Sequence, residues 1–309
     1  MKELVVNPYK DVNWKNQYKA NLHTHANRWA TGHSELDPHE IIDLYHAHGY
    51  KILAITEHLA FVWPWEKFGR SAENLGMLAI KGAELFNYLH QTLCLFETIT
   101  RTADNDVIDI YDAYDEMEIN GASGILAHPR YPLYLEKYDL NWYIETYTKY
   151  PCLFGMEVFN PKYQEAETWW DKILSILMPQ RPVWGVAGHD THIIANEFDK
   201  NHTIIMADRL SETSVRYAME NGHMYFLNGE TPRDVVIKNI HVDKDKGSID
   251  ITAENTQRIE WITKNGRVIE VGNSFSYKHN DALDRYIRIR AVGDNNIAYS
   301  QPFGFIDIG

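Results

Sequence analysis

Two histidines one residue apart end a run that reads as a β-strand near the amino terminus. The run YKANLHTH places His23 and His25 at its end. Side chains on a strand alternate between its faces with a period of two, so both imidazoles project from the same face. Two imidazoles on one face can bind one metal ion. This spacing favours a metal site over packed histidines if further ligands gather at other strand ends.

Histidines and carboxylates also end several other stretches of strand character. The residues at these ends or in the adjoining loops are His23, His25, His58, Glu84, His128, Glu157, Asp190 and His192. His90, in contrast, begins its strand, HQTLCLF. Such a set suits two or three borderline divalent ions, namely Zn, Mn or Fe. Two ions about 4 Å apart lower the pKa of a shared water and stabilise both oxygens of a displacement at phosphorus, so the chemistry indicated is hydrolysis.

The order of secondary structure predicts where these residues meet. Up to about residue 230, apolar runs alternate with segments of helical periodicity, such as the one that Asp37 and Pro38 begin and Gly49 ends. The expected strands are NLHTH, KILAITEH, MLAIKGAEL, HQTLCLF, SGILAHP, CLFGMEVFN and PVWGVAGHD. This alternation predicts parallel strands joined by crossovers in a (β/α) barrel, with functional groups at the carboxyl ends of the strands.

The pattern changes after residue 230. From about Thr231 the chain shows strands such as DVVIKNIHVD and YIRIRAVGD, with a turn signal at Asn265 and Gly266 and no helical segment between them. We therefore expect a barrel domain over residues 1–230 and a small all-β sandwich domain over residues 231–309.

Composition and charge restrict the partners. The chain has 309 residues, of which 44% are hydrophobic and 24% charged, as in globular proteins. Lys plus Arg number 30 against 43 Asp plus Glu, and this net charge of -13 predicts a small-molecule substrate and no nucleic-acid surface. Apolar runs are too short for a bilayer span, so we expect no membrane partner and cytoplasmic location by default, or export as a mature form.

The motif order resembles a known family. HTH, ITEH, GAE, AHP, GMEVFN and GHDTH follow one another as in the PHP family, named for polymerase and histidinol phosphatase, over roughly residues 18 to 230. The lead-in NPYKDVNWKNQYKANLHTH and the later stretch WITKNGRVIEVGNSFSY are similar to a branch of metal-dependent phosphoesterases and carbamate-ester hydrolases. The resemblance implies a distorted (β/α)7 TIM-like barrel that holds two or three metal ions.

The resemblance also implies a ligand set. The first metal would be held by His23, His25, Glu84 and Asp190, with Glu84 bridging to the second. The second metal would be held by Glu84, His128 and His90, and the third by His58, His192 and a residue of the loop after HTH. In that loop Thr31 precedes Gly32 where the family usually has an acidic residue, and His33 is the expected substitute. His189 stands where a small Ser often precedes the Asp.

Four further residues follow the ligand motifs closely. Arg28 and Arg130 can each fork onto a phosphate or carboxylate of the substrate, or form structural salt bridges. Asn160 is an expected substrate contact, and Glu157 is a ligand, an orienting residue or a salt-bridge partner. We count all four as candidate substrate-binding residues.

These expectations favour a phosphoesterase for a small phosphorylated substrate. A metal-bridging hydroxide would attack phosphorus, with Asp190 and His192 as catalytic residues and His192 protonating the leaving group. The first alternative is a carbamate, ester or amide hydrolase that uses the same metal site. The second is a non-catalytic binding module.

Overall fold

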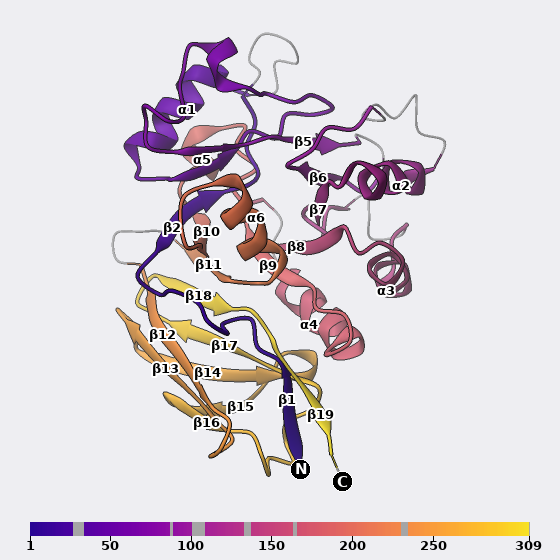
Figure 1. The fold of residues 1–309 in the computed structure, drawn as a ribbon, viewed down its shortest axis with the longest axis vertical. Helices are drawn as coiled ribbons and strands as arrows, with labels where there is room; N and C mark the ends of the chain where they lie inside the picture. The colour runs from indigo at the N-terminus through magenta and orange to yellow at the C-terminus, as the bar shows by residue number, and fades with distance from the viewer. Residues whose placement is uncertain are drawn as a thin grey trace.

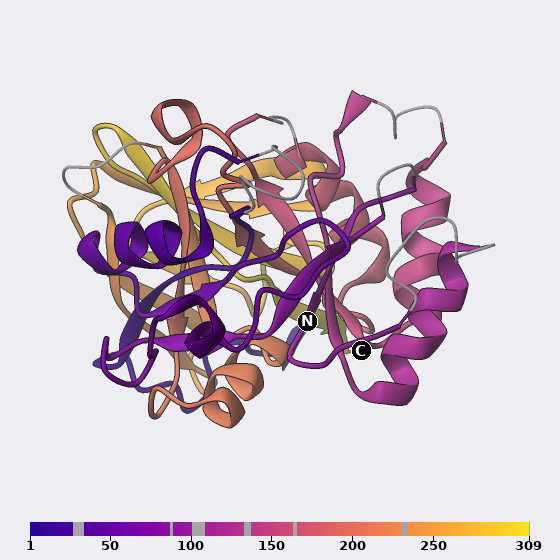
Figure 2. The same ribbon diagram turned by 90° about the horizontal axis from the view of Figure 1, so that it is seen from above.

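The computed structural model describes residues 1–26, 34–86, 89–100, 109–132, 137–162, 166–229 and 234–308. The strands form an eleven-stranded, a five-stranded and a three-stranded sheet. Helices α1, α2, α3, α5 and α6 lie in the upper part of the molecule, α4 lies at the level of β17 and β18, and strands β12 to β19 form the lower part together with β1, with both termini at the bottom (Figure 1). Seen from above, the indigo helix α1 and the magenta helices α2 and α3 lie on opposite sides (Figure 2).

The upper half of the large sheet contains β2, the strand that precedes the predicted His-x-His motif. Its strands are β4 (Leu78–Ile80), β3 (Ile52–Ala54), β2 (Gln17–Asn21), β10 (Asn201–Met206) and β11 (Met224–Gly229). β2, β3 and β4 are parallel, whereas β10 runs antiparallel to both β2 and β11. Helix α1 (Pro38–Ala47) joins β2 to β3 and starts as predicted, because Asp37 precedes it and the Asp37 N–H donates to the Glu40 carboxylate at 2.9 Å.

The five-stranded sheet carries the rest of the site. Its strands in order are β5 (Gly82–Leu85), β6 (Thr92–Leu95), β7 (Ser123–Leu126), β8 (Leu153–Phe159) and β9 (Trp184–Ala187). The other described helices are α2 (Ile110–Asn120), α3 (Leu140–Lys149), α4 (Ala166–Leu177), α5 (Ile194–Glu197) and α6 (Glu212–Glu220), and the short turn η1 (Trp65–Phe68) lies between β3 and β4. None of the helices in the described ranges is long and apolar enough to cross a membrane.

The closed barrel that we expected is not confirmed, although the α/β class is. Among the described residues the ladders leave β2 to β4 and β5 to β9 in separate sheets. β6 is antiparallel to both β5 and β7. Residues 86–91 between β5 and β6 are too few for the crossover that a parallel pair needs. Two isolated bridges, Thr24 to Thr191 and His58 to Glu84, join the two sheets near the carboxyl ends of β2, β3 and β9.

The carboxyl-terminal strands pack as two facing layers. One layer is the sheet of β12 (Val236–Asp243), β13 (Ser248–Glu254) and β16 (Ser274–Ser276). The other contains β14 (Arg258–Thr263), β15 (Arg267–Val271), β17 (Tyr286–Val292), β18 (Asn296–Ser300), β19 (Phe303–Asp307) and β1 (Lys2–Val6), with the turn η3 (Lys264–Gly266). Ile249 of the first layer and Trp261 of the second belong to one buried cluster. β18 also pairs with β11, so this layer is continuous with the upper sheet, and β1 joins it from the start of the chain.

A buried ion pair connects the two parts of the molecule. The Arg288 guanidinium on β17 has no exposed surface and donates to both carboxylate oxygens of Asp171 on α4, at 2.8 and 2.6 Å. It also donates to the Glu167 carboxylate at 2.7 Å. Tyr286 donates to Asp171 as well, at 2.8 Å. Because the guanidinium and Asp171 are both removed from water, each needs the opposite charge of the other to remain ionised at low cost.

We predict that Asp171→Asn lowers the free energy of unfolding by roughly 3 to 5 kcal/mol, because it leaves the buried Arg288 charge without its bidentate partner. Urea unfolding measures this change. Asp307→Asn is the control, since it removes an exposed ion pair with Lys2 and should cost less than about 1 kcal/mol. Equal effects of the two substitutions would contradict the prediction.

Candidate metal centre

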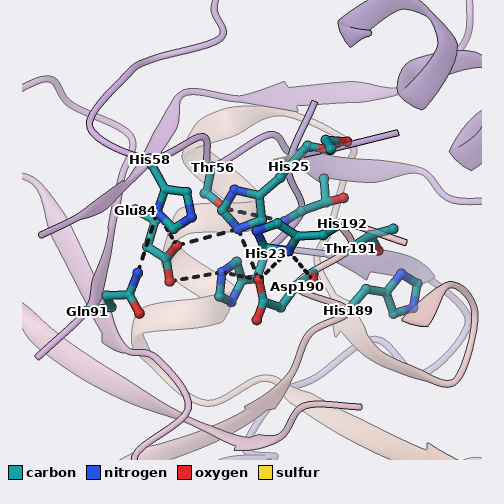
Figure 3. A network of polar contacts seen from close by, with 12 residues as sticks. His23, His25, Thr56, His58, Glu84, Gln91, His189, Asp190, Thr191 and His192 are labelled. Atoms are coloured by element: carbon teal, nitrogen blue, oxygen red, sulfur yellow. Dashed lines mark hydrogen bonds and ion pairs between the residues drawn. The ribbon is translucent and has the colours of Figure 1, made fainter. Parts of the chain in front are cut away.

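The predicted ligands meet between the two sheets at one end of their strands. His23 and His25 follow β2, His58 follows β3, Glu84 lies in β5, and Asp190 follows β9. Figure 3 shows their side chains directed toward one another, whereas His189 is directed away from them. His23, His25 and Glu84 are fully buried.

Glu84 lies in the middle of the histidines. Its Oε1 atom is 3.2 Å from His23 Nε2 and 3.0 Å from His128 Nε2. Its Oε2 atom is 3.0 Å from His58 Nδ1 and 3.4 Å from His25 Nε2. Each carboxylate oxygen therefore faces a different pair of imidazoles, which is the arrangement that a bridging ligand needs.

Asp190 closes the centre from the side of β9. Its Oδ1 atom is 3.0 Å from His25 Nε2 and 3.4 Å from His23 Nε2. The other oxygen, Oδ2, accepts a hydrogen bond from Asn160 at 3.3 Å. Gly188, two residues before Asp190, has no room for a side chain, because a Cβ there would overlap the Glu157 carboxylate. The glycine of the GHDTH motif is therefore required by the close approach of β8.

The atoms that face one another fit a metal ion. Three groups have ligand atoms within 4.8 Å of one another, namely His23, His25 and Glu84; His23, His128 and Asp190; and His25, His58 and His192. His23 Nε2, His25 Nε2 and Glu84 Oε2 are buried and make no hydrogen bond to any described residue. These atoms make ion-pair contacts but no hydrogen bond, which is costly for buried polar atoms, and imidazole nitrogens and carboxylate oxygens are ordinary ligands of divalent cations.

The electrostatics of the centre favour charged side chains. Burial lowers the pKa of His23 and His25, but neighbouring carboxylates raise it more, well above 6.5 for His23 and to about 9 for His25. Burial raises the pKa of Glu84 and Asp190, but the histidines around them lower it well below the usual range. Without metal the imidazoles thus hold protons that a cation must displace.

Glu157 and Asn160 lie behind the predicted ligands. Glu157 Oε1 is 3.0 Å from His23 Nδ1, and its Oε2 accepts from the His128 backbone N–H at 3.0 Å. Asn160 donates to the carboxylates of both Glu157 and Asp190, at 3.2 and 3.3 Å. A proton on His23 Nδ1 that is held by Glu157 leaves Nε2 free to bind metal. Of the three roles considered for Glu157, this placement fits that of an orienting residue.

Two other predicted residues, His90 and Arg130, make contacts with aromatic side chains. His90 is in none of the three groups found among the described residues, because its Nε2 is 2.7 Å from the Tyr143 hydroxyl and its Nδ1 is 2.9 Å from the Gln91 carbonyl. Burial lowers the pKa of His90 to about 3. The Arg130 guanidinium lies 5.4 Å from the centre of the Trp169 ring. The predicted residues Arg28 and His33 lie outside the described part of the chain.

Three charged residues near the ligands were missed by the sequence analysis. Glu57 accepts from the backbone N–H groups of Ala26 and His58, at 3.0 and 3.1 Å. Burial raises the pKa of Glu57, but His25 lowers it to about 2. Glu197 accepts from the backbone N–H of His192, and the side chain of Lys162 reaches the Asp190 carbonyl at 3.0 Å. Glu57 stands inside the ITEH motif, whereas Lys162 and Glu197 carry no signal in the sequence.

No family model matches the chain, and no curated protein matches it by sequence. Solved structures of endonuclease Q match part of it, including a complex with a 27-mer duplex that has an abasic lesion at the active site, and the enzyme from Pyrococcus furiosus. Each is 13% identical with a TM-score of 0.48, and each match covers 66% of this chain and 56% of the other. Our prediction that this protein has no nucleic-acid partner is wrong. Endonuclease Q, which matches part of this chain, holds a duplex substrate, and net charge alone does not exclude such a partner.

Another solved structure matches almost the whole chain. It is a two-domain protein from Bacteroides vulgatus that contains a predicted PHP-like metal-dependent phosphoesterase. The match covers 97% of this chain and 98% of the other, with a TM-score of 0.57 and 17% identity. At that identity the likeness concerns the fold alone. The resemblance of the motifs to the PHP family is thus confirmed at the level of the fold, which for this chain is PHP-like.

Proposed function

We propose that this protein is a metal-dependent hydrolase and that its substrate is a phosphate ester of a small molecule. The observation that carries the proposal is the set of buried ligand atoms, His23 Nε2, His25 Nε2 and Glu84 Oε2, which lie within 4.8 Å of one another and make ion-pair contacts but no hydrogen bonds. The PHP-like fold supports it.

The residues present would hold divalent ions in two overlapping groups. His23, His25, Glu84 and Asp190 would hold the first ion, and Glu84 would share the second with His128. The mixture of imidazole and carboxylate ligands suits Zn, Mn or Fe. Ions bound there would supply Lewis acidity and a nucleophilic water for the displacement.

The surrounding side chains hold the ligands in place. Glu157 keeps the proton of His23 on Nδ1, and Asn160 fixes the Oδ2 atom of Asp190 so that Oδ1 points to the centre. Arg28 and Arg130 remain the proposed contacts for an anionic group of the substrate. The division into a barrel-derived domain of residues 1–230 and a β domain of residues 231–309 also remains a proposal.

We predict that Asp190→Asn lowers the metal content of the purified protein by at least one ion per chain and its hydrolytic activity by about 100-fold or more. Asn keeps the shape of the side chain but removes the charge that faces His25 at 3.0 Å. Elemental analysis and hydrolysis of p-nitrophenyl phosphate and bis-p-nitrophenyl phosphate measure the two effects. The exposed Asp208→Asn is the control.

The same assays separate the candidate functions. Hydrolysis of aryl carbamates or esters, with no hydrolysis of either phosphate ester, would replace the phosphoesterase by the carbon-centred hydrolase. Metal-replete protein that hydrolyses none of these substrates would favour the non-catalytic binding module. Protein that takes up no metal even after reconstitution would refute the metal-dependent hydrolase itself.

Removal of metal should also destabilise the fold. Binding to the folded state alone, at a free metal concentration of 100 times the Kd, stabilises a protein by about 2.7 kcal/mol per site. We therefore expect chelation with EDTA to lower the melting temperature and Mn²⁺ or Zn²⁺ to restore it. Calorimetry measures the shift, which should be smaller in Asp190→Asn. An unchanged melting temperature would count against a metal within the buried centre.

Glu157→Gln should weaken metal binding without removing a ligand. The amide no longer offers His23 Nδ1 a charged acceptor, and loss of such an orienting carboxylate typically costs about 10- to 100-fold in metal affinity. Competition with a fluorescent chelator measures the affinity. The exposed Glu254→Gln serves as the matched control. An affinity equal to that of the wild type would show that Glu157 does not orient the ligand.

A further inference from the structure

Asn21, the last residue of β2, connects the two segments that carry the proposed ligands of the first ion. Its side chain is fully buried. The amide oxygen accepts from the backbone N–H of His189 at 3.0 Å, and the amide nitrogen donates to the His23 carbonyl at 2.9 Å. A backbone N–H can only donate and a backbone carbonyl can only accept, so these two bonds fix the orientation of the amide. No titrating group takes part in either bond.

Backbone hydrogen bonds continue this connection along the two segments. The Asp190 N–H donates to the same His23 carbonyl at 2.9 Å, and the His25 N–H donates to the Thr191 carbonyl at 3.2 Å. Three consecutive residues of the loop are thus bound to alternate residues of the strand end, and only the Asn21 link uses a side chain. The three links together set the register between the two segments.

Tyr45 on α1 supports the Asn21 amide and the loop together. Its hydroxyl oxygen lies 3.1 Å from the Asn21 amide nitrogen, 2.7 Å from His189 Nδ1 and 3.2 Å from Thr191 Oγ1. Tyr45 has no exposed surface, so these contacts are shielded from bulk water. A third element of the fold is thereby joined to the two segments that carry ligands.

We propose that Asn21 and Tyr45 are positioning residues of the first metal site. They hold the strand end and the loop in the register at which His23, His25 and Asp190 face the same ion. The inference rests on the metal site proposed above. Asn21 and Tyr45 act on the backbone and on the neighbours of the ligands, and they supply no ligand atom themselves.

Loss of the Asn21 amide should reach the ligands through the backbone. Leucine at this position fills a similar space but neither accepts nor donates, so the buried His189 N–H loses its acceptor, which is costly. The loop is then free to shift away from the strand end. Asp190 Oδ1 is only 3.0 Å from His25 Nε2 and 3.4 Å from His23 Nε2, so a shift changes the spacing of all three ligands.

Metal affinity, measured by competition with a fluorescent chelator, tests the role of Asn21. Asn21→Leu should bind Zn²⁺ about 10- to 100-fold more weakly than the wild type. Asn296→Leu on β18 is the matched control, because Asn296 is also buried and its amide oxygen accepts from the backbone N–H of Val235 at 3.0 Å. This control should lower the melting temperature and leave the affinity of the folded protein unchanged.

Tyr45→Phe keeps the proposal testable if Asn21→Leu does not fold. It removes only the hydroxyl, and it should weaken Zn²⁺ binding by about 10-fold. Tyr9→Phe is its control, because the Tyr9 hydroxyl is buried and donates to the Met224 carbonyl at 3.0 Å, in a different part of the fold. An affinity equal to that of the wild type in either Asn21→Leu or Tyr45→Phe would overturn the role of that residue.

The visible spectrum of Co²⁺-loaded protein distinguishes positioning from a merely structural role. The absorption bands of Co²⁺ depend on the geometry of its ligands. They should shift in Asn21→Leu and Tyr45→Phe and remain as in the wild type in Asn296→Leu and Tyr9→Phe. Wild-type bands in both positioning variants would overturn the proposal even if the affinity falls, because ligands that keep their geometry have not lost their register.

The outcomes also separate this inference from the proposed function. A wild type that binds metal and hydrolyses phosphate esters, with unchanged affinity in both positioning variants, would overturn the inference and leave the hydrolase intact. A wild type that binds metal but hydrolyses no phosphate ester would refute the phosphoesterase, and weaker binding with shifted bands in the two variants would still support the positioning roles. A wild type that binds no metal would refute both.

Discussion

A carboxylate that is fully buried among histidines is the constraint on which this structure depends. Glu84 has no exposed surface, and an ionised carboxylate removed from water costs several kcal/mol unless opposite charges or a metal compensate it. The compensating imidazoles are His23, His25, His58 and His128. They follow strands of two different sheets, so those sheets have to meet at one point, and the isolated bridge between His58 and Glu84 lies there.

Two residues at the centre adopt a backbone conformation that is unfavourable for residues other than glycine. Asp190 has a φ angle of 48° and His128 one of 24°, in the left-handed region that costs non-glycine residues of order 1 to 3 kcal/mol. The Asp190 N–H donates to the His23 carbonyl at 2.9 Å, and the His128 N–H donates to Glu157. These bonds tie each strained residue to a neighbouring strand, so the fold holds the ligands in conformations that a free loop would leave.

Part of the architecture could be predicted because it depends on local sequence. Helix α1 begins after Asp37 with Pro38 at its first position, as the sequence predicts. The predicted strand MLAIKGAEL instead divides at Lys81 into β4 and β5, which belong to different sheets. Periodicity does not fix the direction of a strand or its pairing partner, so it did not reveal that β6 runs antiparallel or that the ladders leave a gap.

For the site, the sequence by itself determined which residue types stand at the strand ends. His23 and His25 lie just after β2, on either side of Thr24, which forms an isolated bridge with Thr191, and both imidazoles lie at the centre as the period of two predicts. Only the tertiary structure decided what each group does. It turns His90 toward Tyr143, sets Glu157 behind His23 and brings Lys162 to His192. Which group a side chain bonds to depends on its neighbours in space, and in these three cases the neighbour is remote in the chain.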